Sequence, residues 1–174
     1  MRTIIVVGLA RSGKDTAAEM LAEMLGCAKY NLSDVLADEL KAQGKSVDKE
    51  ALARLGDEMR AKHGMAIVAE RLMERIPKNK DAVISGARSE GEVEHIKRER
   101  NGAVVLEVYA EEDARFARRS GRDPEERERF FARDKADIEK KGLKKVLEGA
   151  DFRVVNNSSM DELRKELDKL IRNI

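Results

Sequence analysis

The stretch IIVVGLARSGKDT, residues 4–16, carries a run of apolar residues directly into a glycine loop. Gly8, Gly13 and Lys14 have the spacing Gly, four residues, Gly-Lys that is typical of phosphate-binding loops. A buried strand leads into this loop and an amphipathic helix leaves it, so backbone N–H groups and a helix N-terminus converge where phosphate oxygens bind. A tight turn without a ligand needs only one or two glycines and leaves Lys14 unexplained. The stretch therefore predicts a nucleotide site.

The composition favours one intracellular domain. The chain has 174 residues, which fits a single domain, and 40% of them are charged, against about 25% in an average protein. Lys and Arg total 35 and Asp and Glu total 34, so the net charge gives no case for a nucleic-acid or membrane-surface partner. Cys27 is the only cysteine, which excludes an intramolecular disulfide and favours a reducing, cytoplasmic setting. No signal peptide or membrane span is expected, and the protein is expected to be a monomer or a homodimer.

Apolar runs alternate with helical periodicity along the whole chain, which is typical of a parallel sheet covered by helices. The predicted strands are residues 3–7, 28–32, 82–85, 103–109 and 152–155. The first predicted helix follows the glycine loop, the second runs from 33 to about 43, the third begins near 48 and the fourth covers 67–76. A further helix begins near 89, most of 111–141 is helical, and a last helix begins near 160. The expected N-caps are Ser33 or Asp34, Ser89 in a capping box with Glu92, Asp123 with Pro124 at the first helical position, and Ser159 in a capping box with Glu162.

The segment RSGKDT, residues 11–16, resembles the phosphate loop of phosphoryl-transfer kinases, including phage-type deoxynucleoside-monophosphate kinases. The rest of the chain, through residue 171, resembles an adenylate-kinase-related family of P-loop proteins, also described as dephospho-CoA-kinase-like, within the nucleoside-monophosphate-kinase-like superfamily. The resemblance implies an α/β fold: a three-layer α/β/α P-loop NTPase with a five-stranded parallel sheet in the order 2-3-1-4-5. It also implies an acceptor-binding helical region at about 33–76, a helical lid at about 111–141, and ATP and Mg²⁺ as cofactors.

Four further segments carry this resemblance. They are NLSDVLADEL at 31–40 for the start of the acceptor region, VISGAR at 83–88 for a strand end with a phosphate-contacting Arg, RFARRSGRD at 115–123 for the lid, and VVNNSS at 154–159 for the loop beside the donor's base. The implied donor-binding residues are Gly8, Arg11, Ser12, Gly13, Lys14, Asp15, Thr16 and Asn156. The implied catalytic residues are Lys14, Arg88, Arg119 and Arg122; the acceptor residues are Asp34, Arg60 and Arg88; and the metal residues are Asp15, Thr16 and Ser85.

Three positions depart from the family pattern. Asp15 replaces the loop hydroxyl, Ser85 replaces the acidic residue at the strand end, and Ala37 replaces an Arg that faces the acceptor phosphate. Because Mg²⁺ prefers oxygen ligands, Asp15 can supply the charge lost at Ser85, with Thr16 or Ser85 as a neutral oxygen. The alternative is that Asp15 only balances the helix dipole, which contributes about 0.3–1 kcal/mol.

Arginines are the predicted phosphate contacts, because a guanidinium group binds phosphate through two parallel hydrogen bonds. Arg60 and Arg88 are candidates to replace the Arg missing at position 37; for Arg60, a surface ion pair with Asp57, Glu58 or Glu90 is an equal alternative. Among the lid arginines (Arg115, Arg118, Arg119 and Arg122), Arg119 and Arg122 are preferred. Asp34 is a candidate general base for a hydroxyl acceptor, or else an N-cap.

These features predict ATP-dependent phosphoryl transfer to a nucleoside monophosphate or a nucleotide-like small molecule. Within the same class, a dephospho-CoA-type kinase is the alternative. From another class, Ala37 and Ser85 favour a nucleotide-binding regulator or slow ATPase that lacks efficient transfer. A nucleic-acid-binding module is disfavoured, because the chain has only two Tyr and four Phe for base stacking.

Overall fold

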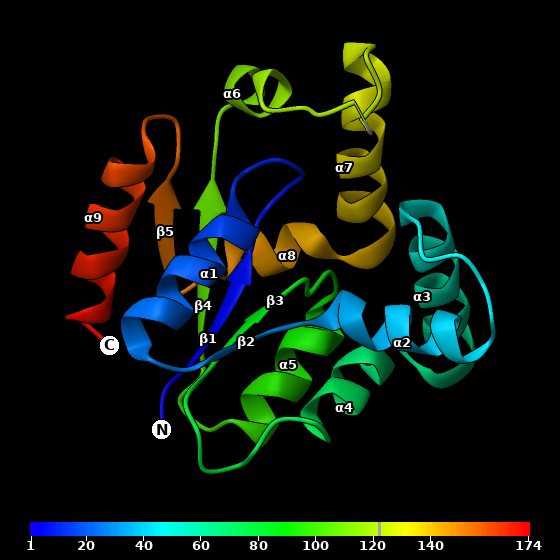
Figure 1. The fold of residues 1–174 in the computed structure, drawn as a ribbon, viewed down its shortest axis with the longest axis horizontal. Coiled ribbons are helices and arrows are strands. Elements are labelled where there is room, and N and C mark those ends of the chain that lie inside the picture. Colours follow the sequence, from blue (N-terminus) through cyan, green and yellow to red (C-terminus); the bar gives the residue numbers. More distant parts are fainter. Residues whose placement is uncertain (122) are drawn as a thin grey trace.

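The computed structural model describes residues 1–121 and 123–174 as a three-layer sandwich (Figure 1). Five parallel strands form one sheet within these ranges: β1 (Thr3–Val7), β2 (Ala28–Asn31), β3 (Ala82–Ser85), β4 (Val104–Tyr109) and β5 (Phe152–Val155). The strand order is β2-β3-β1-β4-β5, which confirms the predicted topology. Thr3 pairs with Ala82 and Ile4 with Val104, so β1 lies at the centre of the sheet.

The helices of the described residues are α1 (Lys14–Leu25), α2 (Leu32–Ala42), α3 (Lys49–His63), α4 (Ile67–Met73), α5 (Glu90–Glu99), α6 (Glu112–Ala117), α7 (Arg127–Lys141), α8 (Leu143–Glu148) and α9 (Met160–Ile171). Among them, α8 was not predicted. It is a short helix whose Leu143 and Val146 are buried against the sheet.

The two faces of the sheet form two separate cores, because side chains alternate along each strand. Ile5 and Val7 pack with residues of α2, α4, α5 and α8, whereas Ile4 and Val6 pack with residues of α1 and α9. All residues of β1 are buried, as expected for a central parallel strand that is covered on both faces.

The structure corrects two of the predicted N-caps. Asn31 caps α2, with its Oδ1 accepting the N–H of Ser33 at 2.9 Å, so the second strand ends one residue earlier than predicted and neither Ser33 nor Asp34 is the cap. Helix α7 begins at Arg127 after the N-cap Glu126, not at Pro124. Asp123 does not cap this helix because its carboxylate is engaged in ion pairs with other segments.

The other two N-caps are confirmed. Ser89 and Glu92 form a complete capping box, and the side chain of Ser159 accepts the N–H of Glu162 at the start of α9.

The carboxyl ends of the strands form one edge of the sheet, where ligands gather in α/β proteins. The loop after β1 opens at this edge; in Figure 1, α6 lies above the arrowhead of β4 and α7 stands to the right of the strands. Within the described ranges, no helix combines the length and the apolar character that a membrane span requires.

Candidate functional site

A cavity of about 600 Å³ opens at the carboxyl ends of the strands. The glycine loop and the start of α1 form one wall, and residues of α2, α3 and the loop after β3 form the opposite wall. Of the predicted site residues, Gly8, Arg11, Gly13, Lys14, Asp15, Thr16, Arg60 and Arg88 line this cavity. A single space is therefore bounded by the predicted donor loop on one side and by predicted acceptor residues on the other.

The glycines of the loop are required by close packing. Gly13 has φ 93° at the N-cap of α1, and a Cβ atom there would lie 2.2 Å from Asn156 Nδ2. A Cβ atom at Gly8 would lie 2.5 Å from the backbone oxygen of Val108. A side chain at Gly13 would displace the Asn156 side chain and strain the backbone at that positive φ, and one at Gly8 would press on the backbone of β4.

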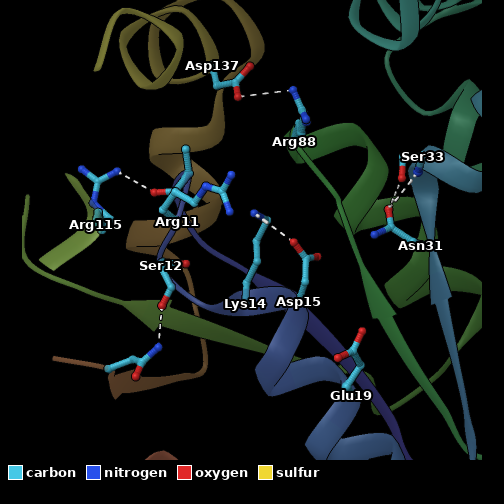
Figure 2. A network of polar contacts seen from close by, with 12 residues as sticks. Arg11, Ser12, Lys14, Asp15, Glu19, Asn31, Ser33, Arg88, Arg115 and Asp137 are labelled. Atoms are coloured by element: carbon cyan, nitrogen blue, oxygen red, sulfur yellow. Dashed lines mark hydrogen bonds and ion pairs between the residues drawn. The ribbon is translucent and has the colours of Figure 1, made fainter. Parts of the chain in front are cut away.

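Asn156 and Ser12 support the loop instead of lining the cavity. Asn156 is buried, and its Nδ2 donates to the backbone oxygen of Ser12 at 2.8 Å (dashed line at Ser12 in Figure 2). The backbone N–H of Asn156 donates to Tyr109 O at 2.7 Å, so Asn156 ties the loop to the end of β4. Ser12 is also buried, and its hydroxyl has no hydrogen-bond partner among the described residues.

Arg11 has a left-handed backbone, with φ 61°, which is costly for a residue with a side chain. Its side chain leaves the loop and binds the segment before α7: Nε donates to Asp123 Oδ2 at 2.7 Å and Nη2 donates to Ser120 Oγ at 2.6 Å. The other oxygen of Asp123 accepts from Lys49 Nζ at 2.9 Å, at the start of α3. One carboxylate thus joins three segments that are far apart in the sequence.

The charge of Asp123 is stabilised by these contacts. Burial by itself would raise the pKa of this carboxyl group, but hydrogen bonds from the N–H of Ser120, from Lys49 and from Arg11 outweigh burial and hold the pKa well below its usual range. The carboxyl group of Asp123 is therefore ionised in the folded protein near neutral pH.

Lys14 and Asp15 face the cavity from the first turn of α1. Figure 2 shows their side chains directed toward one another, with Nζ 3.7 Å from Oδ2. The side chain of Asp15 is 59% exposed, so its carboxylate is open to a ligand. Thr16 lines the cavity beside it.

The oxygens at this wall suit a hard cation. Asp15 offers a carboxylate and Thr16 a hydroxyl, which are the ligand types that Mg²⁺ takes while keeping several waters. Ser85 lies deeper: it is fully buried, does not line the cavity, and its hydroxyl has no hydrogen-bond partner among the described residues. The donor set therefore fits Mg²⁺ at Asp15 and Thr16, whereas Ser85 does not line the cavity.

The wall formed by residues of α2, α3 and the loop after β3 carries both apolar and polar side chains. Leu36, Leu52 and Val68 form its surface, and Asn31 and Ser33 lie at the start of α2. Asp34 is exposed and does not line the cavity, because α2 begins at Leu32 and directs that position outward.

Arg60 is buried at this wall and is paired with a partner that the sequence did not indicate. Its Nη2 lies 2.7 Å from Glu92 Oε1 in α5, whereas Asp57 is 3.6 Å away. The ion pair with Asp57 that the sequence offered as an alternative is therefore present, but the shorter contact of the buried Arg60 is with the buried Glu92. Glu92 Oε2 also accepts the N–H of Arg88 at 2.7 Å, so Glu92 fixes both arginines.

Arg88 extends into the cavity from the loop after β3. Its Nη1 lies 3.5 Å from Asp137 Oδ2 in α7, and Figure 2 shows the two facing each other across the site from Lys14. The side chain is 42% exposed, so it remains available to a ligand.

Of the two neighbouring arginines at the end of α6, Arg118 lines the cavity and Arg119 does not. The guanidinium of Arg119 stacks over the ring of Phe116, 4.2 Å from its centroid. Arg118 has a buried Nη1 without a hydrogen-bond partner among the described residues. Arg122, the other predicted lid arginine, lies outside the described residues.

Several cavity residues were not predicted as site residues: Asn31, Ser33, Lys49, Arg118 and Asp137. Arg118 was among the lid arginines, but a helix of several arginines gives no signal for which one faces inward. Lys49 and Asp137 are ordinary charged residues of helices in the sequence, and only the packing of α3 and α7 brings them to the cavity.

The strand order, the glycine loop and the cavity together define a P-loop protein with a kinase-like fold. Among solved structures, TT1252 from Thermus thermophilus is similar, with a TM-score of 0.66 at 22% identity, covering 100% of this chain and 97% of that one. A shikimate kinase from Bacteroides thetaiotaomicron is similar with a TM-score of 0.64 at 14% identity, covering 98% and 97%. At these identities the similarity shows the fold.

Sequence relatives give the family. Residues 4–142 match the model of a family described as an AAA domain. A UPF0200 protein of Pyrobaculum aerophilum is 31% identical over 176 residues, covering 98% of this chain and 97% of that protein. A UPF0200 protein of Hyperthermus butylicus is 32% identical, covering 97% and 92%. The chain belongs to the UPF0200 family and, through the matched model, to this group of AAA-domain proteins.

Proposed function

We propose that this protein transfers a phosphoryl group from ATP, with Mg²⁺, to a nucleoside monophosphate or a nucleotide-like small molecule. The observation that carries the proposal is the single cavity in which the phosphate loop faces Arg60 and Arg88. Transfer requires the donor's terminal phosphate and the acceptor to lie in one water-poor space, because positioning and electrostatic stabilisation supply most of the catalysis. The kinase-like fold is consistent with this activity.

On the donor side, Lys14 and the loop N–H groups hold the phosphates of the nucleotide, supported from behind by Asn156. Asp15 and Thr16 hold Mg²⁺, which neutralises phosphate charge when bound. The negative charge of Asp15 takes the place of the carboxylate that the family pattern has at position 85, where this chain has a serine.

On the acceptor side, Arg88 binds the anionic group of the acceptor, and Leu36, Leu52 and Val68 contact its apolar part. Arg60 lies at the same wall, with its charge balanced by Glu92. Arg118 stabilises the charge that develops on the transferring group, because this arginine lines the cavity. In this proposal α6 and α7 form the lid, at about 111–141, and α2 to α4 form the acceptor region, at about 33–76. The two regions belong to one domain of 174 residues, a monomer or homodimer of the cytoplasm.

A second candidate is a nucleotide-binding regulator or slow ATPase. Ser85 and Ala37 favour it, because the metal carboxylate and the acceptor arginine of the family pattern are both absent at those positions. A dephospho-CoA-type acceptor is the alternative within the kinase class.

The test is nucleoside-diphosphate production by purified protein with Mg²⁺ and ATP or GTP, against a panel of ribonucleoside and deoxyribonucleoside monophosphates and dephospho-CoA. Lys14→Ala is the inactive variant, and Lys144→Ala, an exposed lysine of α8, is its matched control. Turnover that depends on an acceptor and on Lys14 supports the kinase and identifies the acceptor class. Tight nucleotide binding with acceptor-independent turnover supports the regulator.

A further inference from the structure

Two buried side chains of the lid hold the tip of the phosphate loop. Asp134 Oδ1, in α7, accepts the N–H of Ala10 at 3.2 Å. Arg115 Nη1, in α6, donates to the backbone oxygen of Ala10 at 3.1 Å and also forms an ion pair with Asp134. Both side chains are almost fully buried, at 3% exposure for Arg115 and 6% for Asp134. The two peptide groups that flank Ala10 are therefore held by one ion pair.

These contacts act on the strained part of the loop. The peptide group that Arg115 holds is the one that joins Ala10 to Arg11, the residue with φ 61°. A residue with a side chain keeps a left-handed backbone only where its surroundings determine the conformation. The turn continues into Gly13 and Lys14 at the cavity, so the orientation of the later loop N–H groups depends on it.

The pairing also solves an electrostatic problem. A lone carboxylate beside the phosphate loop would repel the phosphates of a nucleotide. Arg115 cancels that charge, so the hydrogen bond from Ala10 to Asp134 is kept without a net negative charge at the loop. This explains why the acidic residue and its arginine are buried together behind the loop.

We propose that Asp134 is a positioning residue for the phosphate loop, with Arg115 as its neutralising partner, so that a lid side chain sets the affinity of the loop for a nucleoside triphosphate. The inference rests on the proposed nucleotide binding. It predicts that the lid acts on the donor site through the loop backbone, in addition to any direct contact made by Arg118.

The experiment compares two double variants. Arg115→Met with Asp134→Leu removes both loop hydrogen bonds and both charges, so no unpaired charge is left buried. Arg115→Gln with Asp134→Asn also removes the charges but keeps a donor and an acceptor for Ala10. Arg127→Gln is the matched control, because Arg127 is a lid arginine whose ion pairs are with the exposed Glu112 and Asp113.

Three quantities are measured for each protein: the melting temperature, the Kd of a fluorescent ATP analogue with Mg²⁺, and hydrogen exchange of residues 8–14 without nucleotide. The Arg115→Met/Asp134→Leu variant, the apolar pair, is expected to weaken nucleotide binding about tenfold, the effect of two lost hydrogen bonds, and to speed hydrogen exchange in the loop. For the Arg115→Gln/Asp134→Asn variant, the polar pair, the Kd is expected to stay within about threefold of the wild-type Kd. The Arg127→Gln control is expected to have the Kd of the wild type.

An apolar pair that binds nucleotide as tightly as the wild type, with unchanged loop exchange, would overturn the inference even if it melted at a lower temperature. If this pair does not fold, Asp134→Glu replaces it, since the charge is kept while the carboxylate is moved; unchanged binding and exchange would then overturn the inference. A wild type that binds no nucleotide would overturn the proposed function instead, and loop exchange would still report whether Asp134 positions the loop.

Discussion

Arg60 of α3 and Glu92 of α5 form a buried ion pair in which Nη2 lies 2.7 Å from Oε1. Glu92 Oε1 also accepts from Arg60 Nε at 3.0 Å, and its Oε2 accepts the N–H groups of Arg88 and Ser89. A carboxylate with no exposed surface thus connects an acceptor-wall arginine, the loop after β3 and the N-terminus of α5. Glu92 therefore holds the side chain of Arg60 and the backbone of Arg88.

Glu92→Gln is expected to lower the free energy of unfolding by about 3 kcal/mol, because it leaves the Arg60 guanidinium buried without its counter-charge. Urea denaturation at pH 7 measures this. Glu90→Gln is the control: Glu90 is an exposed residue of the same helix, paired with Lys145 at the surface, and its loss should cost less than about 1 kcal/mol. Equal effects of the two substitutions would contradict the assignment.

Asp15→Ala is expected to weaken binding of the magnesium nucleotide about tenfold, while binding of the nucleotide in EDTA stays the same or becomes tighter. Removing a metal ligand costs affinity only when the metal is present, and removing a negative charge relieves repulsion of the phosphates when it is absent. Isothermal titration with ATP analogues in both buffers measures the difference. Glu19→Ala, an exposed carboxylate of the same helix, should change neither value; equal weakening by Asp15→Ala in both buffers would exclude a metal role for Asp15.

Arg118→Ala is expected to lower kcat about 100-fold with a smaller change in the KM for nucleotide, since the side chain is proposed to act on charge that develops during transfer. Arg119→Ala is expected to change kcat by less than about threefold, because its guanidinium stacks on Phe116 outside the cavity. Steady-state kinetics with an acceptor identified from the proposed panel compares the two variants. A larger loss for Arg119→Ala would show that the lid rearranges during turnover.

The pH dependence of stability is expected to report on Asp123. Its pKa is lower in the folded chain than in the unfolded chain, so the stability that its charge contributes is fully present above the unfolded pKa of about 3.9. That contribution is lost as the pH falls toward the lower folded pKa. Asp123→Asn should therefore cost about 2 kcal/mol at pH 7, and the difference from wild type should shrink steadily below about pH 4.

Thermal or urea unfolding of both proteins between pH 3 and pH 7 measures this effect. Glu125→Gln, an exposed carboxyl two residues away, serves as the control. A cost for Asp123→Asn that stays constant from pH 7 to pH 3 would mean that its ion pairs with Arg11 and Lys49 do not stabilise the fold.

Most element positions were predictable, because β-branched runs, helical periodicity and the glycine loop are local signals. The strand order was predicted through the resemblance of the chain to a family and not from these signals. The errors occurred where distant residues compete for a local role. Asp123 has the sequence context of an N-cap, but Arg11 and Lys49 bind its carboxylate and α7 begins later, after Glu126. Helix α8 is too short for its periodicity to be read.

The candidate site was predictable on the donor side and less so on the acceptor side. Gly8, Gly13 and Lys14 are close together in the chain, so their spacing is itself the signal. The inward position of Arg118 instead of Arg119 depends on the end of α6, and the burial of Arg60 depends on its contact with α5. Asp34 is a plausible base by position, but it is exposed outside the cavity.

The amino-acid sequence by itself determined the P-loop and the α/β class with a parallel sheet, since these follow from local spacing and periodicity, while the order of the strands came from the resemblance to a family. Only the tertiary structure decided which charged side chains meet: Arg11 with Asp123, Arg60 with Glu92, and Arg115 with Asp134. With 40% of the residues charged, many ion pairs are possible in the sequence. Burial selects among them, because a charge removed from water is stable only beside its partner.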